Sequence, residues 1–150
     1  MTITFCGHAC FMKTEEYEQK ILAFLEETVG DKAADMYLGG YGAFDSFAYD
    51  CCKKYKETHP EVSLVFVTPY LTEEYQRNHL EYSKTRYDEI IYPEIEDKPL
   101  RFAITYRNRY MVDKADFVVA YVTHNSGGAY STYSYAKRKG KKIFSLVSFD

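Results

Sequence analysis

The stretch DFVVAYV at residues 116–122 is followed at once by THNSGG at residues 123–128, and this succession decides the fold class. The first segment is a nearly continuous apolar run, which is typical of a strand buried on both faces of a sheet. In the second segment, Ser126 can cap a helix that the two glycines open. A strand that passes directly into a helix is the building unit of a parallel α/β sheet.

The same alternation extends over the rest of the chain. Strands are predicted at residues 2–6, 35–38, 62–67, 89–92, 116–122 and 142–146, and helices at residues 15–29, 43–57, 100–114 and 126–139. The polar, tyrosine-rich residues 70–88 are expected to be irregular or weakly helical. The pattern predicts an α/β fold, a Rossmann-like three-layer sandwich with a mostly parallel central sheet. Residues 1–150 fit one domain.

Composition narrows the class of protein. No apolar run approaches the ~20 residues of a membrane helix, and no secretion signal is visible, so we expect a cytoplasmic protein without a membrane partner. The four cysteines, Cys6, Cys10, Cys51 and Cys52, are then expected to be reduced, buried side chains. Cys6 and Cys10 flank His8, but this spacing is not a standard zinc pattern, and we expect no metal.

Charge is unevenly spread along the chain. Residues 100–142 hold nine Lys or Arg against two Asp or Glu, whereas the whole chain has a net charge of −3. This asymmetry favours an anionic partner for the C-terminal part. The basic run at residues 137–142 also ends a predicted helix, where cations complement the helix dipole. The sequence does not decide between these two interpretations of the run.

Parallel sheets bind ligands beyond the carboxyl ends of their strands, at a topological switch point. That rule selects the loops at residues 7–12, 39–45 and 123–128. Two of them carry glycines at the start of a helix, where free backbone N–H groups can bind phosphate. The expected ligand-binding residues in these loops are Gly7, His8, Gly39, Gly40, Gly42, Asp45, Ser126, Gly127 and Gly128.

Arg107 and Asn108 complete the expected ligand site from the helix before residue 116. Arg107 projects into the apolar stripe of that helix, which is costly for a guanidinium without a partner. The partner is either an internal carboxylate, such as Asp45 or Asp116, or a ligand phosphate. His8 can donate or accept a hydrogen bond or act as an acid or base. No nucleophilic triad can be argued from residue spacing.

These motifs, in this order, resemble the SLOG superfamily, a Rossmann-like group that includes the DprA/Smf proteins, the YpsA-like proteins and the LOG hydrolases. The resemblance rests on Gly7-His8, on residues 39–45, on residues 107–109 with 113–116, and on residues 126–128. It implies a nucleotide-derived ligand at the carboxyl ends of the strands, and the nearest subgroup is YpsA-like. LOG enzymes carry Thr and Glu where this chain has Ala43 and Ser46.

The leading hypothesis is therefore a non-catalytic or weakly catalytic protein that binds a nucleotide-like, phosphate-bearing small molecule and uses no cofactor. Ligand sensing is one role that fits this hypothesis. An alternative is cleavage or transfer of an N-glycosidic bond, with Asp45 as the catalytic carboxylate. A third is a DprA-type accessory protein that binds single-stranded DNA. The net acidity of the chain disfavours nucleic acid as a partner. Analogy with related domains suggests a homodimer.

Overall fold

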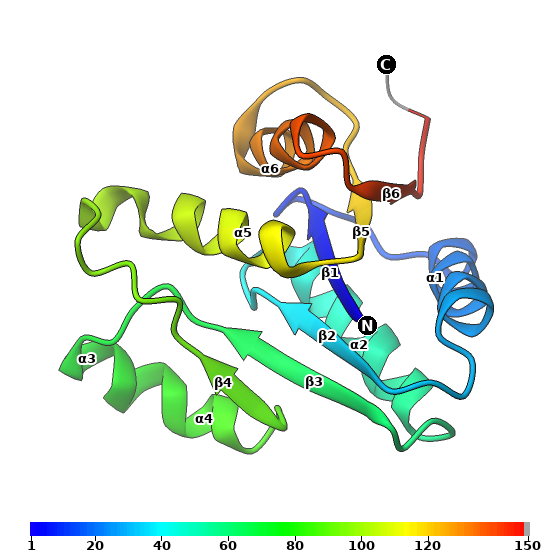
Figure 1. Cartoon of the computed structure of the whole chain (residues 1–150), viewed down its shortest axis with the longest axis horizontal. Helices are drawn as coiled ribbons and strands as arrows, with labels where there is room; N and C mark the ends of the chain where they lie inside the picture. Colours follow the sequence, from blue (N-terminus) through cyan, green and yellow to red (C-terminus); the bar gives the residue numbers. More distant parts are fainter. Residues whose placement is uncertain (149–150) are drawn as a thin grey trace.

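Six strands form one sheet in the order β4-β3-β2-β1-β5-β6, and every neighbouring pair is parallel (Figure 1). The computed structural model describes residues 1–148, and residue 76 through its backbone alone. The strands are β1 (Thr2–Gly7), β2 (Ala34–Leu38), β3 (Val62–Val67), β4 (Glu89–Ile91), β5 (Phe117–Tyr121) and β6 (Lys142–Ser145). The predicted α/β class is confirmed, and all six predicted strands are present.

Helices cover both faces of the sheet (Figure 1). One face carries α1 (Glu15–Thr28) and α2 (Gly42–Lys56), and the other carries α5 (Ala103–Lys114) and α6 (Gly127–Arg138). A single 3-10 turn, η2 (Leu100–Phe102), leads into α5. The short segments α3 (Glu73–Tyr75), η1 (Gln76–Leu80) and α4 (Glu81–Lys84) connect β3 to β4. This layering confirms the predicted Rossmann-like sandwich.

Local sequence signals explain the ends of the first helix. Thr14 caps α1, since its hydroxyl oxygen accepts a hydrogen bond of 3.1 Å from the backbone N–H of Tyr17. Gly30, just beyond the helix, has a φ of +56°. Thr is favoured at an N-cap, and Gly is favoured just beyond the C-terminal end of a helix.

Residues 73–84 form short helical turns, which is one of the two forms expected for residues 70–88. Two other details differ from the predictions. The helix predicted from residue 100 begins at Ala103, and Leu100 is 67% exposed because it lies in η2, before α5 begins. Cys10 is exposed, in contrast to the buried Cys6, Cys51 and Cys52, because it lies in the loop beyond β1. All four cysteines are free thiols.

The order of the strands places the switch point between β1 and β5. The chain builds β1 to β4 outward in one direction and then crosses through α5 to begin again on the other side of β1. The loop after β1 leads to α1 on one face of the sheet, and the loop after β5 leads to α6 on the other face. A crevice between the two loops is expected at the carboxyl edge of the sheet. Among the helices of residues 1–148, none has the length and apolar character needed to span a bilayer.

Candidate functional site

Two pockets open at the carboxyl edge of the sheet, and Asp45 lines both of them. The tyrosine pocket, with a volume of about 270 Å³, is lined by Gly40, Gly42, Asp45, Ser46, Tyr49, Phe66, Tyr75, Asn78, His79, Tyr82, Ser83, Arg86 and Tyr87. The rim pocket, of about 150 Å³, is lined by Phe5, Cys6, Gly7, Ala9, Tyr41, Asp45, Ile104, Arg107, Asn108, Met111, Gly128, Ala129 and Thr132.

The rim pocket brings together the loops that the switch-point rule selected. Tyr41 and Asp45, from the loop after β2, line it together with Gly128, from the start of α6. Five expected ligand-binding residues line this pocket: Gly7, Asp45, Arg107, Asn108 and Gly128. Gly40 and Gly42 line the tyrosine pocket instead. The lining of neither pocket includes His8, Gly39, Ser126 or Gly127.

The loop between β2 and α2 uses two of its backbone N–H groups internally. The N–H of Tyr41 donates to Asp45 Oδ2 over 3.0 Å, and the N–H of Ala43 donates to the carbonyl oxygen of Ala9 over 2.9 Å. Gly42 has a φ of +89°, and a Cβ there would lie 2.7 Å from Ala9 Cα. These two amides are therefore not the free anion donors that the sequence suggested, because the loop packs tightly against the residues after β1.

Asp45 is a half-buried carboxyl group that lines both pockets. Burial raises its pKa to about 6, although the hydrogen bond from Tyr41 and the positive charge of Arg107 both favour the ionised form. A carboxyl group with a raised pKa that lines a pocket can exchange a proton near neutral pH. Ser46, at the position of the LOG glutamate, lines the tyrosine pocket beside it.

Arg107 is 2% exposed and is held by backbone oxygens. Its Nη1 donates to the carbonyl of Gly39 over 2.7 Å and to the carbonyl of Val67 over 2.8 Å. Its Nε donates to Asn108 Oδ1 over 2.9 Å. The guanidinium thus ties the ends of β2 and β3 to α5. These partners are carbonyl and amide oxygens, and not the internal carboxylate or ligand phosphate that the sequence suggested. Burial lowers the pKa of Arg107, and the negative charge of Asp45 opposes that shift.

The start of α6 is the least occupied part of the rim pocket. Ser126 is the N-cap residue, but its side chain makes no capping hydrogen bond. A Cβ placed on Gly128 would have no neighbouring heavy atom within 4 Å. Thr132 connects this turn to α5, since its hydroxyl donates to the carbonyl of Gly128 and accepts from the side-chain amide of Asn108. The first turn of α6 is therefore open to a small anionic group.

His8 supports the loop after β5 and does not face either pocket. Its Nε2 accepts a hydrogen bond of 2.9 Å from the N–H of Thr123, and its ring stacks on that of His124 at 3.9 Å. Burial and the neighbouring His124 lower the pKa of His8. The imidazole is consequently neutral in this arrangement, because Nε2 must carry a free lone pair.

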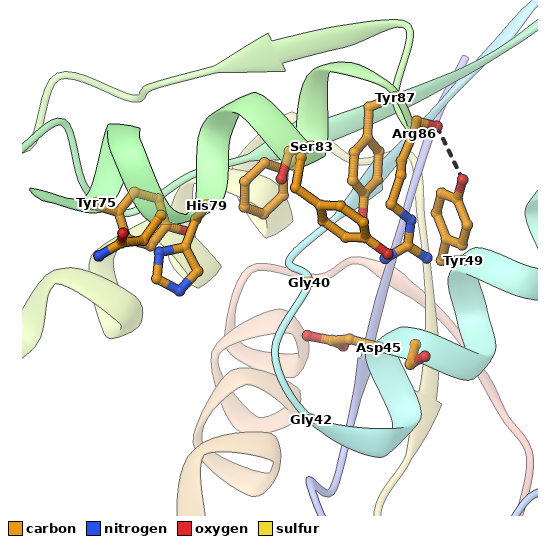
Figure 2. Close-up of a pocket in the computed structure, with 13 residues that line it drawn as sticks. Gly40, Gly42, Asp45, Tyr49, Tyr75, His79, Ser83, Arg86 and Tyr87 are labelled. Carbon is orange, nitrogen blue, oxygen red and sulfur yellow. Dashed lines mark hydrogen bonds between the residues drawn. The ribbon is translucent and has the colours of Figure 1, made fainter.

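The tyrosine pocket contains residues that the sequence motifs did not indicate (Figure 2). The Arg86 guanidinium lies over the ring of Tyr49 at 4.1 Å and over the ring of Tyr82 at 5.2 Å. The Tyr49 hydroxyl donates to the Arg86 carbonyl over 3.0 Å, which joins α2 to the end of α4. Among the described residues, no carboxylate forms an ion pair with Arg86.

Comparison with known proteins gives one sequence relative and two structural neighbours. No protein-family model matches the chain. A UPF0398 protein of Halalkalibacterium halodurans is 28% identical over 130 residues, which cover 82% of this chain and 66% of the relative. DNA processing protein A (DprA) of Helicobacter pylori, solved for its single-stranded DNA binding mode, superposes with a TM-score of 0.64 at 15% identity, over 99% of this chain and 66% of that one.

The second structural neighbour is DprA of Streptococcus pneumoniae, with a TM-score of 0.64 at 12% identity, over 99% of this chain and 50% of that one. The sheet order and the two pockets define a Rossmann-like α/β protein with the fold of DprA. The fold shared with the DprA structures agrees with the resemblance to the SLOG superfamily that the motifs suggested. The chain spans about two thirds or less of each of these proteins.

One expectation about partners needs correction. The net acidity of the chain argued against nucleic acid, but the Helicobacter pylori protein, with the same fold, binds single-stranded DNA. Net charge is a sum over the whole surface, and it does not describe the local surface that a strand would contact. Nucleic acid therefore cannot be dismissed on the ground of overall acidity.

Proposed function

We propose that this protein binds a nucleotide unit, with the base among the aromatic rings of the tyrosine pocket. The observation that carries the proposal is the Arg86 guanidinium held between Tyr49 and Tyr82, facing Asp45 and the glycine loop (Figure 2). Aromatic rings stack on the face of any base, and an arginine without an internal carboxylate partner can pair with a phosphate.

The size of the tyrosine pocket limits the ligand to a small one. Its volume of about 270 Å³ lies just below the range of about 300–1,000 Å³ that is common for ligand sites. A single nucleotide unit suits this volume better than a dinucleotide cofactor. Tyr82 is 64% exposed at the mouth, so its ring can close over a bound base.

The nucleotide unit has two chemical sources, a free nucleotide or one residue of a single strand. The single-stranded DNA binding of the Helicobacter pylori neighbour favours the strand. Base stacking and phosphate pairing are common to both sources, so the chemistry of the pocket does not separate them.

Titration calorimetry with nucleoside monophosphates and with a short oligothymidylate tests the proposal. Arg86→Ala is expected to weaken binding about 10- to 100-fold, the effect of losing one charged hydrogen bond. Arg101→Ala is the matched control, because Arg101 is exposed and lies outside both pockets. Binding of the oligonucleotide without any binding of monophosphates would assign the pocket to a strand.

Two results would overturn the proposal. One is a folded wild-type protein, verified by its melting transition, that binds neither the monophosphates nor the oligonucleotide. The other is equal affinity in the Arg86→Ala and Arg101→Ala variants, which would place the ligand elsewhere.

A further inference from the structure

A row of alternating cations and tyrosines crosses the outer surface of α5 and α6. Lys98 Nζ lies 5.2 Å from the centre of the Tyr106 ring. Arg109 is shared by two rings, at 5.5 Å from that of Tyr106 and 5.2 Å from that of Tyr135. The row thus runs from the loop before α5, across α5, and onto α6.

The row continues to the end of α6. The Arg138 guanidinium lies 5.7 Å from the centre of the Tyr135 ring, and Lys139 Nζ lies 5.4 Å from it. Both cations are exposed, whereas Tyr135 and Arg109 are half-buried. Three cations therefore surround one ring.

Two carboxylates adjoin the row, and each has a partner. Asp97 lies 3.7 Å from Lys98, and Asp113 Oδ1 accepts a hydrogen bond of 2.8 Å from the Tyr135 hydroxyl. Neither carboxylate forms an ion pair with Arg109. The row itself carries four cations, Lys98, Arg109, Arg138 and Lys139, three of which belong to the seven-cation surplus of residues 100–142.

The helix dipole does not account for this arrangement. It explains cations in the last turn of α6, such as Arg138, but Lys98 lies before the N-terminus of α5, where the dipole does not favour a cation. Lys141 has a structural role of its own, because its Nζ donates to the carbonyls of Asp113 and Ala115 at the end of α5. The basic run at residues 137–142 therefore divides into structural and surface cations.

We infer that this outer face of α5 and α6, defined by Lys98, Tyr106, Arg109, Tyr135, Arg138 and Lys139, binds a single nucleic-acid strand. Cations at the row contact successive phosphates, while bases stack on the tyrosine rings and on the flat guanidinium of Arg109. We favour a nucleic-acid strand over an acidic peptide, because a peptide of this kind carries negative charge but has no bases to stack on the rings. The inference goes beyond the proposed function, because none of these residues lines the tyrosine pocket.

Fluorescence anisotropy of a labelled oligothymidylate, at a series of salt concentrations, tests the inference. The double variant Arg109→Ala/Arg138→Ala is expected to bind at least tenfold more weakly, and its salt slope is expected to fall by about two, one for each phosphate contact. The double variant Lys32→Ala/Lys53→Ala makes the same charge change away from the row and is expected to bind as the wild type does.

Stacking is tested separately from charge. Tyr135→Leu is expected to weaken binding about 5- to 150-fold, the loss of one base stack, while Tyr135→Phe keeps the ring and the affinity. A melting curve establishes that each variant is folded. If Tyr135→Leu unfolds the protein, the Arg109→Ala/Arg138→Ala result alone decides, since neither arginine is buried.

Three outcomes would overturn the inference. They are equal oligonucleotide affinity in the two double variants, equally tight binding of polyglutamate, and a wild-type dimer that the Arg109→Ala/Arg138→Ala change dissociates. Mononucleotide titration of the same variants separates this test from that of the tyrosine pocket. If a row variant no longer binds the oligonucleotide but still binds the mononucleotide, the result supports both the row and the tyrosine pocket as separate sites. If only Arg86→Ala loses mononucleotide binding, the result concerns the tyrosine pocket alone.

Discussion

Arg107 and Arg86 serve the two pockets in opposite ways. Arg107 lies in the rim pocket, is 2% exposed, and bonds to the backbone carbonyls of Gly39 and Val67. Arg86 lies in the tyrosine pocket, where its guanidinium lies over the rings of Tyr49 and Tyr82. The first arginine holds strands and a helix together, whereas the second is the one that we propose binds the ligand.

If Arg86 binds the ligand as proposed, the arginine within the recognisable motif is not the one that contacts the ligand. The motif arginine satisfies carbonyl groups at the strand ends, which the parallel sheet leaves without partners at its edge. The arginine available for binding comes from the helical segment between β3 and β4. Three measurements test the difference between the two pockets, and they follow in order of decreasing expected effect.

Arg107→Ala should cause the largest loss of stability. It removes the donor of two buried carbonyls and leaves the charge of Asp45 without its neighbouring cation, so we expect a loss of about 3–5 kcal/mol in unfolding free energy. For a chain of this size, that corresponds to a fall of about 10 °C in melting temperature. Calorimetry without ligand measures it, and an equal fall in Arg86→Ala would remove the distinction between the two arginines.

Asp45→Asn should change how stability depends on pH. The pKa of Asp45 is raised from 3.8 to about 6 in the folded protein, so wild-type stability from this group is highest near pH 4 and declines as pH rises to about 6. The decline is on the order of 3 kcal/mol at most. Asn keeps an oxygen for the Tyr41 N–H but has no proton to lose.

Denaturant unfolding of the wild type and Asp45→Asn across pH 4–7 measures this difference. The lowered pKa of His8 acts in the opposite direction, since stability from His8 is lost as pH falls below 6.5, but it is common to both proteins. The two stability curves should therefore diverge between pH 4 and 6. Parallel curves would show that Asp45 titrates as an ordinary exposed carboxylate.

Gly128→Ala should have the smallest effect on stability. The added methyl meets no heavy atom within 4 Å, so we expect a change of at most about 1 kcal/mol, in the stabilising direction that Ala has in a helix. Gly7→Ala is the contrasting variant, because its methyl would overlap the ring of Phe44. Thermal melts of both variants provide the comparison, and a strongly destabilised Gly128→Ala would mean that the rim pocket is closed there.

The sequence predicted the fold more fully than the site. Hydrophobic runs gave β3 at residues 62–67 without any shift, and the alternation of strands and helices was sufficient for the parallel sheet. The loops after β2 and β5 were expected to meet, and Tyr41 and Gly128 do line one pocket. Topology alone determines which strand ends share an edge, so these features follow from local patterns.

The tyrosine pocket could not be predicted in the same way. Its aromatic side chains come from α2, from β3 and from residues 75–87, which have no strong helical or strand period. Tyr82 and Arg86 become neighbours of Tyr49 only when α4 packs beside α2. The signal present in the sequence was the density of tyrosines over residues 70–87, which also hold Arg77 and Arg86, but such density is equally typical of a core.

Asp45 stands in the walls of both pockets, so a ligand in either one would meet the same carboxyl group. A ligand that stabilised the ionised form from one pocket would present that negative charge to the other pocket as well. Two such ligands would be coupled through a single ionisation, and linkage would require the coupling to be equal in both directions.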